Sequence, residues 1–266
     1  MNVNVWMDQI PLVGVFVATM VVVLGAVAGG FWAGTRQGRR QVTGGEGVIG
    51  SVVAAMLGLL AFMLAFTFGA TASRFDTRRQ LLLDEVNAIG TAVLRVEVLP
   101  EPQRSRCKQL LIDYVDLRAN PDDAPEALQS RIAASEEILD RLWAETASLA
   151  ETDMDPPLRA LFLQSINETI DLHTSRVTVG LHYRIPDSVW LCLFGATFCA
   201  MFAVGYQFGI SMQKKVLIHL LLAAPFSSVV LLVADLDRGS EGSLKVDLQP
   251  MQYLQKKLNE AAVPGK

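Results

Sequence analysis

The densest polar pattern in the sequence directly follows an apolar stretch, in the segment Ser73–Ala92 (SRFDTRRQLLLDEVNAIGTA). Arg74 and Arg78 are four residues apart, and Asp84 and Asn87 are three apart, so each pair shares one face of a helix. Two interpretations fit this pattern. The segment is either a helix anchored at a membrane surface and packed against a partner, or it supplies rings of charge that select the ions reaching a pore.

Two aromatic residues precede this segment within the apolar stretch. Phe62 and Phe66 are four residues apart and share one face of a helix. Inside a helix bundle they would be ordinary core residues. Repeated around the axis of an oligomer, they would instead form a hydrophobic constriction that gates a pore by dewetting.

Two carboxylates, Asp235 and Asp237, follow the last apolar stretch and precede Arg238. A carboxylate at the edge of the hydrocarbon is costly without a partner, so we expect Asp235 to pair with an arginine from the Ser73–Ala92 segment. The alternative is a cation held by both carboxylates, because oxygen ligands suit hard cations. The salt bridge is the favoured interpretation.

The sequence contains no recognised motif for catalysis, metal binding or cofactor binding. The three histidines and three cysteines are scattered, and no CxxC, GxSxG, HExxH or Walker sequence occurs. We therefore predict no catalytic residue, no metal site and no cofactor, and we expect that the protein is not an enzyme. A net charge of −4 gives no basic face for nucleic acid.

The composition, with 51% hydrophobic and 19% charged residues, indicates that apolar and charged segments are segregated. Charged residues avoid four stretches, at about residues 10–34, 48–72, 189–212 and 216–234. A helix needs about 20 apolar residues to cross a bilayer, so each stretch is long enough. The first could be a cleaved signal peptide, but its length and the lack of Lys or Arg before it favour a retained crossing.

Between the second and third crossings, apolar residues recur at helical spacing. The second crossing is predicted to continue as one helix to Pro100, and three further helices follow. The predicted fold is therefore an all-α integral membrane protein with four transmembrane helices and an extramembrane domain of helical hairpins. Its parts are an N-terminal transmembrane pair (1–72), the extramembrane domain (73–184), a C-terminal transmembrane pair (185–236) and a C-terminal tail (237–266).

Small residues on the second crossing predict a close helix contact. Gly50, Ala54, Gly58 and Ala61 recur at helical spacing, and such a seam lets a neighbouring helix approach closely.

The basic residues leave the orientation in the membrane open. Arg36, Arg39 and Arg40 in the first connection, with Lys214 and Lys215 in the third, favour an extramembrane domain outside the cell. The arginines that follow the second crossing favour the opposite orientation.

Three segments in this order resemble the bestrophin-like family of bacterial membrane proteins: residues 73–100, GYQFG (205–209) and VADLDRG (233–239). The resemblance covers about residues 47–254. It implies a distant similarity to bestrophins, which are pentameric ion channels with a pore lined by the second crossing, an aromatic and aliphatic constriction, and a cytosolic helical part. Phe62 and Phe66 would then be constriction residues. Bestrophins bind calcium after their last crossing through a longer acidic run, which Asp235, Asp237 and Arg238 do not reproduce.

The resulting hypothesis is an oligomeric channel or channel-like pore in the bacterial inner membrane, in which the protein spans the membrane several times. Its expected partners are the lipid bilayer, further copies of the chain, five in all by the resemblance, and inorganic ions. In this hypothesis Arg74, Arg78, Asp84 and Asn87 lie at the pore mouth. The alternative is a membrane-anchored helical module that binds a partner or acts as a sensor, without transport.

Overall fold

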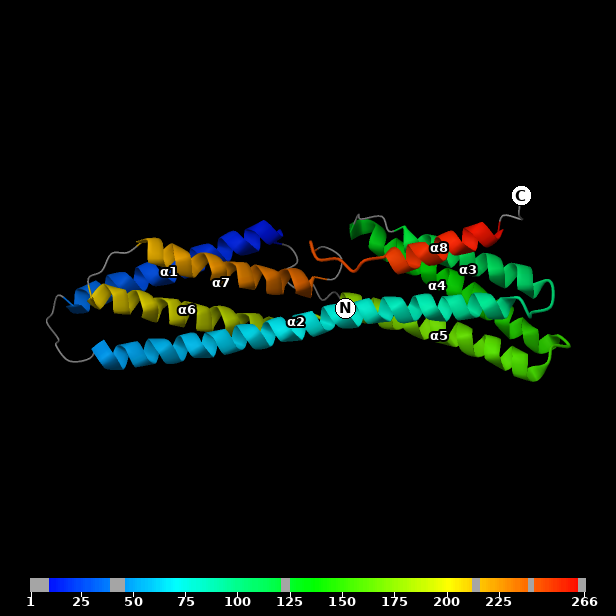
Figure 1. The fold of residues 1–266 in the computed structure, drawn as a ribbon, viewed down its shortest axis with the longest axis horizontal. Helices are drawn as coiled ribbons and strands as arrows, with labels where there is room; N and C mark the ends of the chain where they lie inside the picture. Colours follow the sequence, from blue (N-terminus) through cyan, green and yellow to red (C-terminus); the bar gives the residue numbers. More distant parts are fainter. Residues whose placement is uncertain (1–9, 39–45, 121–124, 212–215, 239–241, 263–266) are drawn as a thin grey trace. The chain divides into compact units, whose positions relative to one another are not determined.

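The computed structural model describes residues 10–38, 46–120, 125–211, 216–238 and 242–262, and all regular structure in them is helical (Figure 1). This confirms the predicted all-α fold class. The helices in chain order are α1 (Leu12–Gly38), α2 (Glu46–Val96), α3 (Gln103–Ala119), α4 (Pro125–Ser148), the short 3-10 helix η2 (Leu149–Glu151), α5 (Pro156–Leu181), α6 (Asp187–Ile210), α7 (Val216–Asp237) and α8 (Gln249–Ala262). Among the described helices, α1, α2, α6 and α7 are long and apolar enough to cross a membrane, as predicted. α2 continues well beyond the apolar stretch and ends just before Pro100.

The described residues form two compact units, and the first, here called the membrane unit, combines the described residues up to Arg74 with those from Arg184 to Leu244. It contains α1, α6, α7 and the apolar part of α2. Its core consists of aliphatic side chains and one tryptophan, among them Val23, Leu60, Trp190, Leu193 and Val230. Within this unit α1 lies along α6 and also contacts α7.

Glycines allow α1 and α6 to approach until their backbones touch. A Cβ atom added to Gly30 would lie 2.0 Å from the Phe202 carbonyl oxygen, and one added to Gly205 would lie 2.1 Å from the Val27 carbonyl oxygen. Within the chain, the seam of small residues predicted on α2 makes no such backbone contact, and a Cβ atom added to Gly50 would lie 3.3 Å from the side-chain nitrogen of Gln207. No atom outside its own helix lies within 4 Å of a Cβ added to Gly58. The close approach therefore belongs to a different helix pair.

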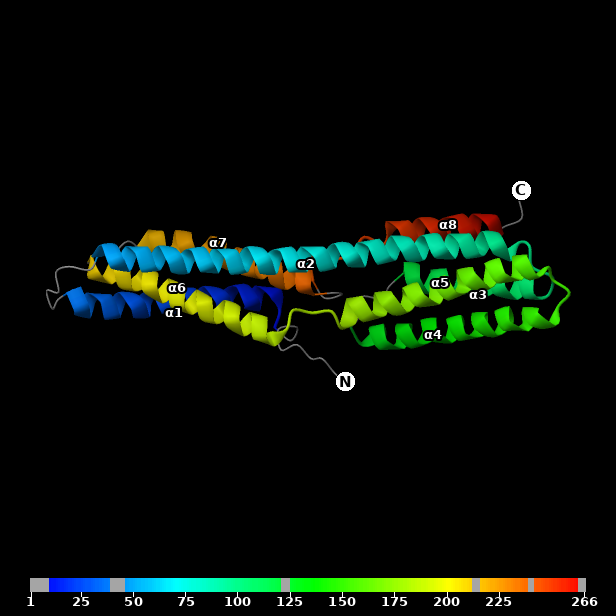
Figure 2. The same cartoon turned by 90° about the horizontal axis from the view of Figure 1, so that it is seen from below.

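The second unit, here called the helical unit, combines Phe75–Tyr183 with the described residues from Lys245 onward. α3 packs against α4 and α8, and α4 packs against α5. α8 and α5 lie on opposite sides of α2 in both views (Figures 1 and 2). The core of the unit is formed by fully buried side chains such as Leu99, Leu111, Leu142, Phe162 and Ile166.

The C-terminal region differs from the expected tail. Asp237 is the last residue of α7, and the amphipathic helix α8 belongs to the helical unit. Met251, Leu254 and Leu258 of α8 are buried in the core of that unit. Their spacing of three and four residues is the signal that the sequence analysis missed.

A buried ionic cluster joins α2, α3 and α5. Glu85 of α2 is completely buried, and its carboxylate forms an ion pair with Arg176 of α5. The Arg118 guanidinium of α3 lies 3.6 Å from the same carboxylate, and the Tyr114 hydroxyl donates to its other oxygen at 2.5 Å. A buried carboxylate is tolerated only with such partners, so Glu85 fixes α2 against α3 and α5.

His173 extends this cluster as a neutral side chain. Its Nδ1 lies 3.0 Å from the Tyr114 hydroxyl oxygen. Because the tyrosine proton is directed to Glu85, Nδ1 carries a hydrogen and donates to Tyr114. The pKa of His173 is lowered to about 4, first by burial and then by Arg118, with Arg176 adding to the effect against the opposing influence of Glu85.

We expect Gly205→Ala to destabilise the protein by about 1–3 kcal/mol, because the added methyl group overpacks the α1–α6 contact. Thermal unfolding of the detergent-purified protein measures this loss. Gly25→Ala on α1 is the matched control, since nothing lies within 4 Å of its Cβ position. A Gly205→Ala protein as stable as the wild type would contradict the close contact.

We expect Glu85→Gln to destabilise the protein by about 3–5 kcal/mol, because it leaves two mostly buried arginines facing a neutral group. The measurement is unfolding followed by circular dichroism at neutral pH. Asp84→Asn changes the neighbouring carboxylate, which accepts from Gln80 on the surface, and should alter stability by less than about 0.5 kcal/mol. A loss of stability in Glu85→Gln as small as that expected for Asp84→Asn would show that the cluster is not stabilising.

We expect His173 to make the protein less stable as the pH falls from about 6.5 to about 4. In that interval the unfolded histidine binds a proton and the folded one does not, so acid favours unfolding, with a total effect on the order of 3 kcal/mol. Unfolding free energies at several pH values in this range test the expectation. His173→Gln should flatten this part of the profile, and an unchanged slope would contradict the assignment.

Candidate functional site

One face of α2 is not covered by the chain. Phe62 is 68% exposed and Phe66 is 70% exposed, whereas Leu60 and Leu64, which point away from them, are buried. Large apolar side chains left exposed on a folded chain mark contact with lipid or with another protein surface. The predicted constriction residues therefore lie on the outer face of α2.

The uncovered face of α2 continues beyond the two phenylalanines, where its exposed residues are mostly polar. Positions separated by three or four residues are all exposed or partly exposed, and we call them the α2 stripe: Phe62, Phe66, Gly69, Ser73, Asp76, Gln80, Asp84, Asn87 and Thr91. In a continuous helix such positions share one face, and the spacing is that of residues facing a helix of another chain or an axis. The stripe changes from aromatic to polar and contains two carboxylates and no basic residue.

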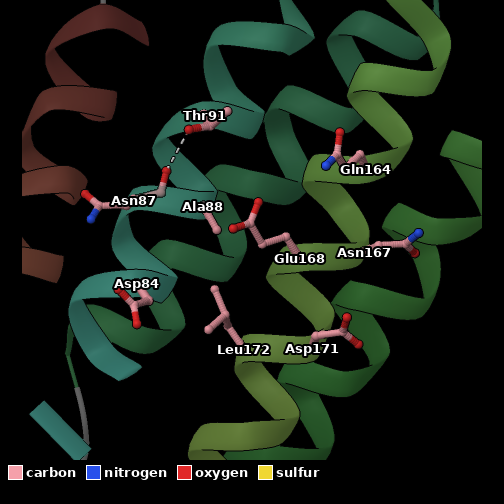
Figure 3. A pocket seen from close by; sticks show the side chains of 9 residues that line it. All are labelled: Asp84, Asn87, Ala88, Thr91, Gln164, Asn167, Glu168, Asp171 and Leu172. Atoms are coloured by element: carbon pink, nitrogen blue, oxygen red, sulfur yellow. Dashed lines mark hydrogen bonds between the residues drawn. The ribbon is translucent and has the colours of Figure 1, made fainter. Parts of the chain in front are cut away.

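The polar end of the stripe lines a groove between α2 and α5 with a volume of about 580 Å³. Asp84, Asn87 and Thr91 come from α2, and the Glu168 carboxylate of α5 extends into the space between the two helices (Figure 3). The remaining lining residues are Ala88, Gln164, Asn167, Asp171 and Leu172. The lining carries three carboxylates and no basic side chain, so its charge is negative.

Arg74 and Arg78 do not line this groove. The Arg74 Nη1 atom lies 3.5 Å from Asp237 Oδ1 at the end of α7, with 31% of the arginine side chain exposed. The Arg78 guanidinium lies 6.0 Å from the centre of the Phe75 ring. Of the four residues predicted at a pore mouth, Asp84 and Asn87 line the groove, and the two arginines do not.

The carboxylates after the last crossing have different partners from those expected. The salt bridge predicted for Asp235 is formed by Asp237. Asp235 instead accepts hydrogen bonds from the backbone nitrogen of Ser243 at 2.6 Å and from the Ser243 hydroxyl. Two positions that are two residues apart in a helix differ in direction by about 200°, so only one of these carboxylates faces α2.

Asp237 is the centre of a buried cluster at this end of the membrane unit. Its Oδ1 accepts the backbone N–H of Ile185 at 3.0 Å, and its carbonyl oxygen accepts from the Arg184 guanidinium. The neighbouring Arg238, also buried, donates to the Ile10 carbonyl oxygen. Protein donors thus occupy both carboxylates, and the described residues contain no group of three side chains suited to hold a metal.

Sequence reasoning missed the buried Glu85 and the groove residues of α5. Glu85 adjoins Asp84 and has no distinguishing neighbour in the sequence, so only the packing of α3 and α5 identifies it. The polar positions on α5, such as Gln164, Glu168 and Asp171, are spaced by three or four residues. That spacing indicates a polar helix face, but it does not say which helix lies opposite.

Comparison with known proteins places these features in a family. Residues 12–251 match the bestrophin-like domain family. No curated protein matches the chain.

Solved structures are similar in fold. One point mutant of a bacterial bestrophin homologue from Klebsiella pneumoniae has a TM-score of 0.63 at 16% identity, covering 93% of this chain and 99% of that one. A second point mutant of the same homologue gives 0.65 at 15% identity, covering 95% and 99%. A further structure, described as a membrane protein, gives 0.67 at 15% identity, covering 96% and 99%. At these identities the similarity to the solved structures concerns the fold. The match of residues 12–251 to the family model shows that the chain belongs to the bestrophin-like family.

Proposed function

We propose that the chain assembles into a homo-oligomeric ion channel in the bacterial inner membrane, with its pore lined by α2. The observation that carries this proposal is the α2 stripe, which the chain leaves exposed or partly exposed over its whole length. Membership of the bestrophin-like family supports a channel-like membrane protein, and the fold resembles that of bacterial bestrophin homologues. The resemblance favours five copies around the axis.

The continuity of the stripe across the end of the apolar stretch supports a pore. Phe62 and Phe66 are apolar and exposed, as lipid contact would also allow. The same 3- and 4-residue spacing continues beyond the apolar stretch through Ser73, Asp76 and Gln80, so one uncovered face runs from the crossing into the polar segment. A water-filled axis accommodates both parts, since rings of phenylalanine would form a dewetting constriction and the polar residues would contact hydrated ions.

The permeant species in this proposal are inorganic ions, and no catalytic activity is proposed. The pore needs no bound cofactor, because hydrophobic gating and the field of charged side chains are supplied by the chain itself. The second candidate is a membrane-anchored interaction module, which the exposed polar groove between α2 and α5 would serve as a binding surface.

We expect Phe66→Ser to increase the ion leak through the protein, because a hydroxyl group at the constriction lowers the cost of wetting it. The measurement is ion flux from liposomes that contain the purified protein. Phe68→Ser is the matched control, since Phe68 lies in the same apolar segment but outside the α2 stripe, and it should leave the flux unchanged.

Two outcomes would contradict this function. Equal leaks in Phe66→Ser and Phe68→Ser would argue against α2 as the pore-lining helix. Absence of flux from the wild type and both variants, with insertion into the liposomes verified, would argue against a channel and favour the interaction module.

A further inference from the structure

We infer that Asp237 determines the ion selectivity of the proposed pore by holding the Arg74 guanidinium away from the α2 stripe. This inference rests on the proposed function and assigns a role to a residue that does not itself line the pore. Asp237 is thus a positioning residue, and Arg74 is the charge that it positions.

Arg74 stands next to the stripe in the sequence and in the helix. It directly follows Ser73, a member of the stripe, and successive residues of an α-helix differ in direction by about 100°. An arginine side chain is long and flexible enough to turn its charged end toward water beyond its own helix face. Without a partner at the side, this guanidinium would therefore reach the water-filled axis.

The partner at the side is Asp237. The Arg74 Nη1 atom lies 3.5 Å from Asp237 Oδ1, and the arginine side chain is 31% exposed, whereas the aspartate side chain is 6% exposed. The arginine is thus the accessible member of the pair, and the carboxylate is the buried one. Because of this difference in exposure, the Arg74 side chain can move away from the pair toward water, whereas the Asp237 side chain cannot.

Asp237 keeps its position through contacts that do not involve Arg74. Its Oδ1 accepts the Ile185 backbone N–H at 3.0 Å, and its backbone carbonyl accepts from Arg184. It also terminates α7, whose last turn is buried in the membrane unit. A change at Arg74 therefore leaves the carboxylate in place, whereas a neutral residue at position 237 removes the charge that attracts the guanidinium.

The charge of the pore mouth depends on this pair. In the native arrangement the stripe beside Arg74 presents Ser73 and Asp76. A released guanidinium would add one positive charge per subunit at that level, and a ring of positive charge repels cations and attracts anions. At separations of about 4–8 Å in water, one unit charge changes an ion's energy enough to alter its local concentration about two- to fivefold.

The test is the cation-to-anion permeability ratio, obtained from reversal potentials of the full-length protein in lipid bilayers under a salt gradient. We expect Asp237→Asn to lower this ratio about four- to twenty-fivefold, because the added charge depletes cations and enriches anions about two- to fivefold each. Arg74→Gln should leave the ratio unchanged, because the native guanidinium is already withheld from the axis. The double variant Arg74→Gln/Asp237→Asn should return the ratio to the wild-type value, which a general folding defect at position 237 would not do.

Asp235→Asn is the matched control. Asp235 lies in the same last turn of α7 and is equally buried, but it binds Ser243 and not an arginine of α2. Its neutral variant should keep the wild-type permeability ratio. A shift as large as that of Asp237→Asn would overturn the inference, because it would mean that any carboxylate at this end of α7 sets the ratio.

The remaining outcomes are also decisive. A conducting Asp237→Asn protein with the wild-type ratio overturns the inference and leaves the channel proposal standing. A change caused by Arg74→Gln alone overturns it as well, and this variant retains the buried contacts of Asp237 even where Asp237→Asn fails to fold. Absence of conduction in the wild type overturns both the inference and the proposed function.

Discussion

α2 is one continuous helix with an apolar part suited to hydrocarbon and a polar part suited to water, and the rest of the structure depends on this constraint. Its apolar part has the length and composition to cross hydrocarbon, where each backbone polar group must be bonded within the helix. The same helix continues into a polar segment suited to water. One side of it packs against the chain through Leu60, Leu82 and Ile89. The opposite side is left uncovered, and the candidate site lies on it.

Buried carboxylates hold each part of α2 in a different way. Glu85 is completely enclosed and is bonded by Tyr114 and two arginines, so losing its charge would leave those mostly buried arginines without a counter-charge. Asp237 is also buried, but its arginine on α2 is partly exposed. The first arrangement therefore serves stability. The second permits the arginine to move, which is why we assign it a role in selectivity.

Close packing within the membrane unit depends on glycine rather than on large side chains. Between α1 and α6 the glycines Gly30 and Gly205 leave room for the carbonyl groups of the facing helix. Contact at this distance increases dispersion attraction, which is a main source of helix association in lipid. Gly58 and Ala61 of α2 are small as well, but they lie on its exposed side and do not provide a comparable backbone contact within the chain.

The sequence by itself determined the features that depend on local chemistry. Unbroken apolar length identified the crossings, proline-rich breaks delimited the helices of the extramembrane part, and helical spacing placed Phe62 and Phe66 on one face. These signals reside within single segments. The family resemblance rested in the same way on contiguous motifs.

Only the tertiary structure decided which side chains meet. It paired Arg74 with Asp237 instead of Asp235, buried Glu85 while leaving Asp84 at the groove, and placed α8 in the core of the helical unit. Neighbouring positions on a helix point in different directions, so the burial and the partners of their side chains depend on how each helix is rotated about its axis relative to the helices it packs against. Packing over the whole chain sets that rotation, and no single segment of the sequence records it.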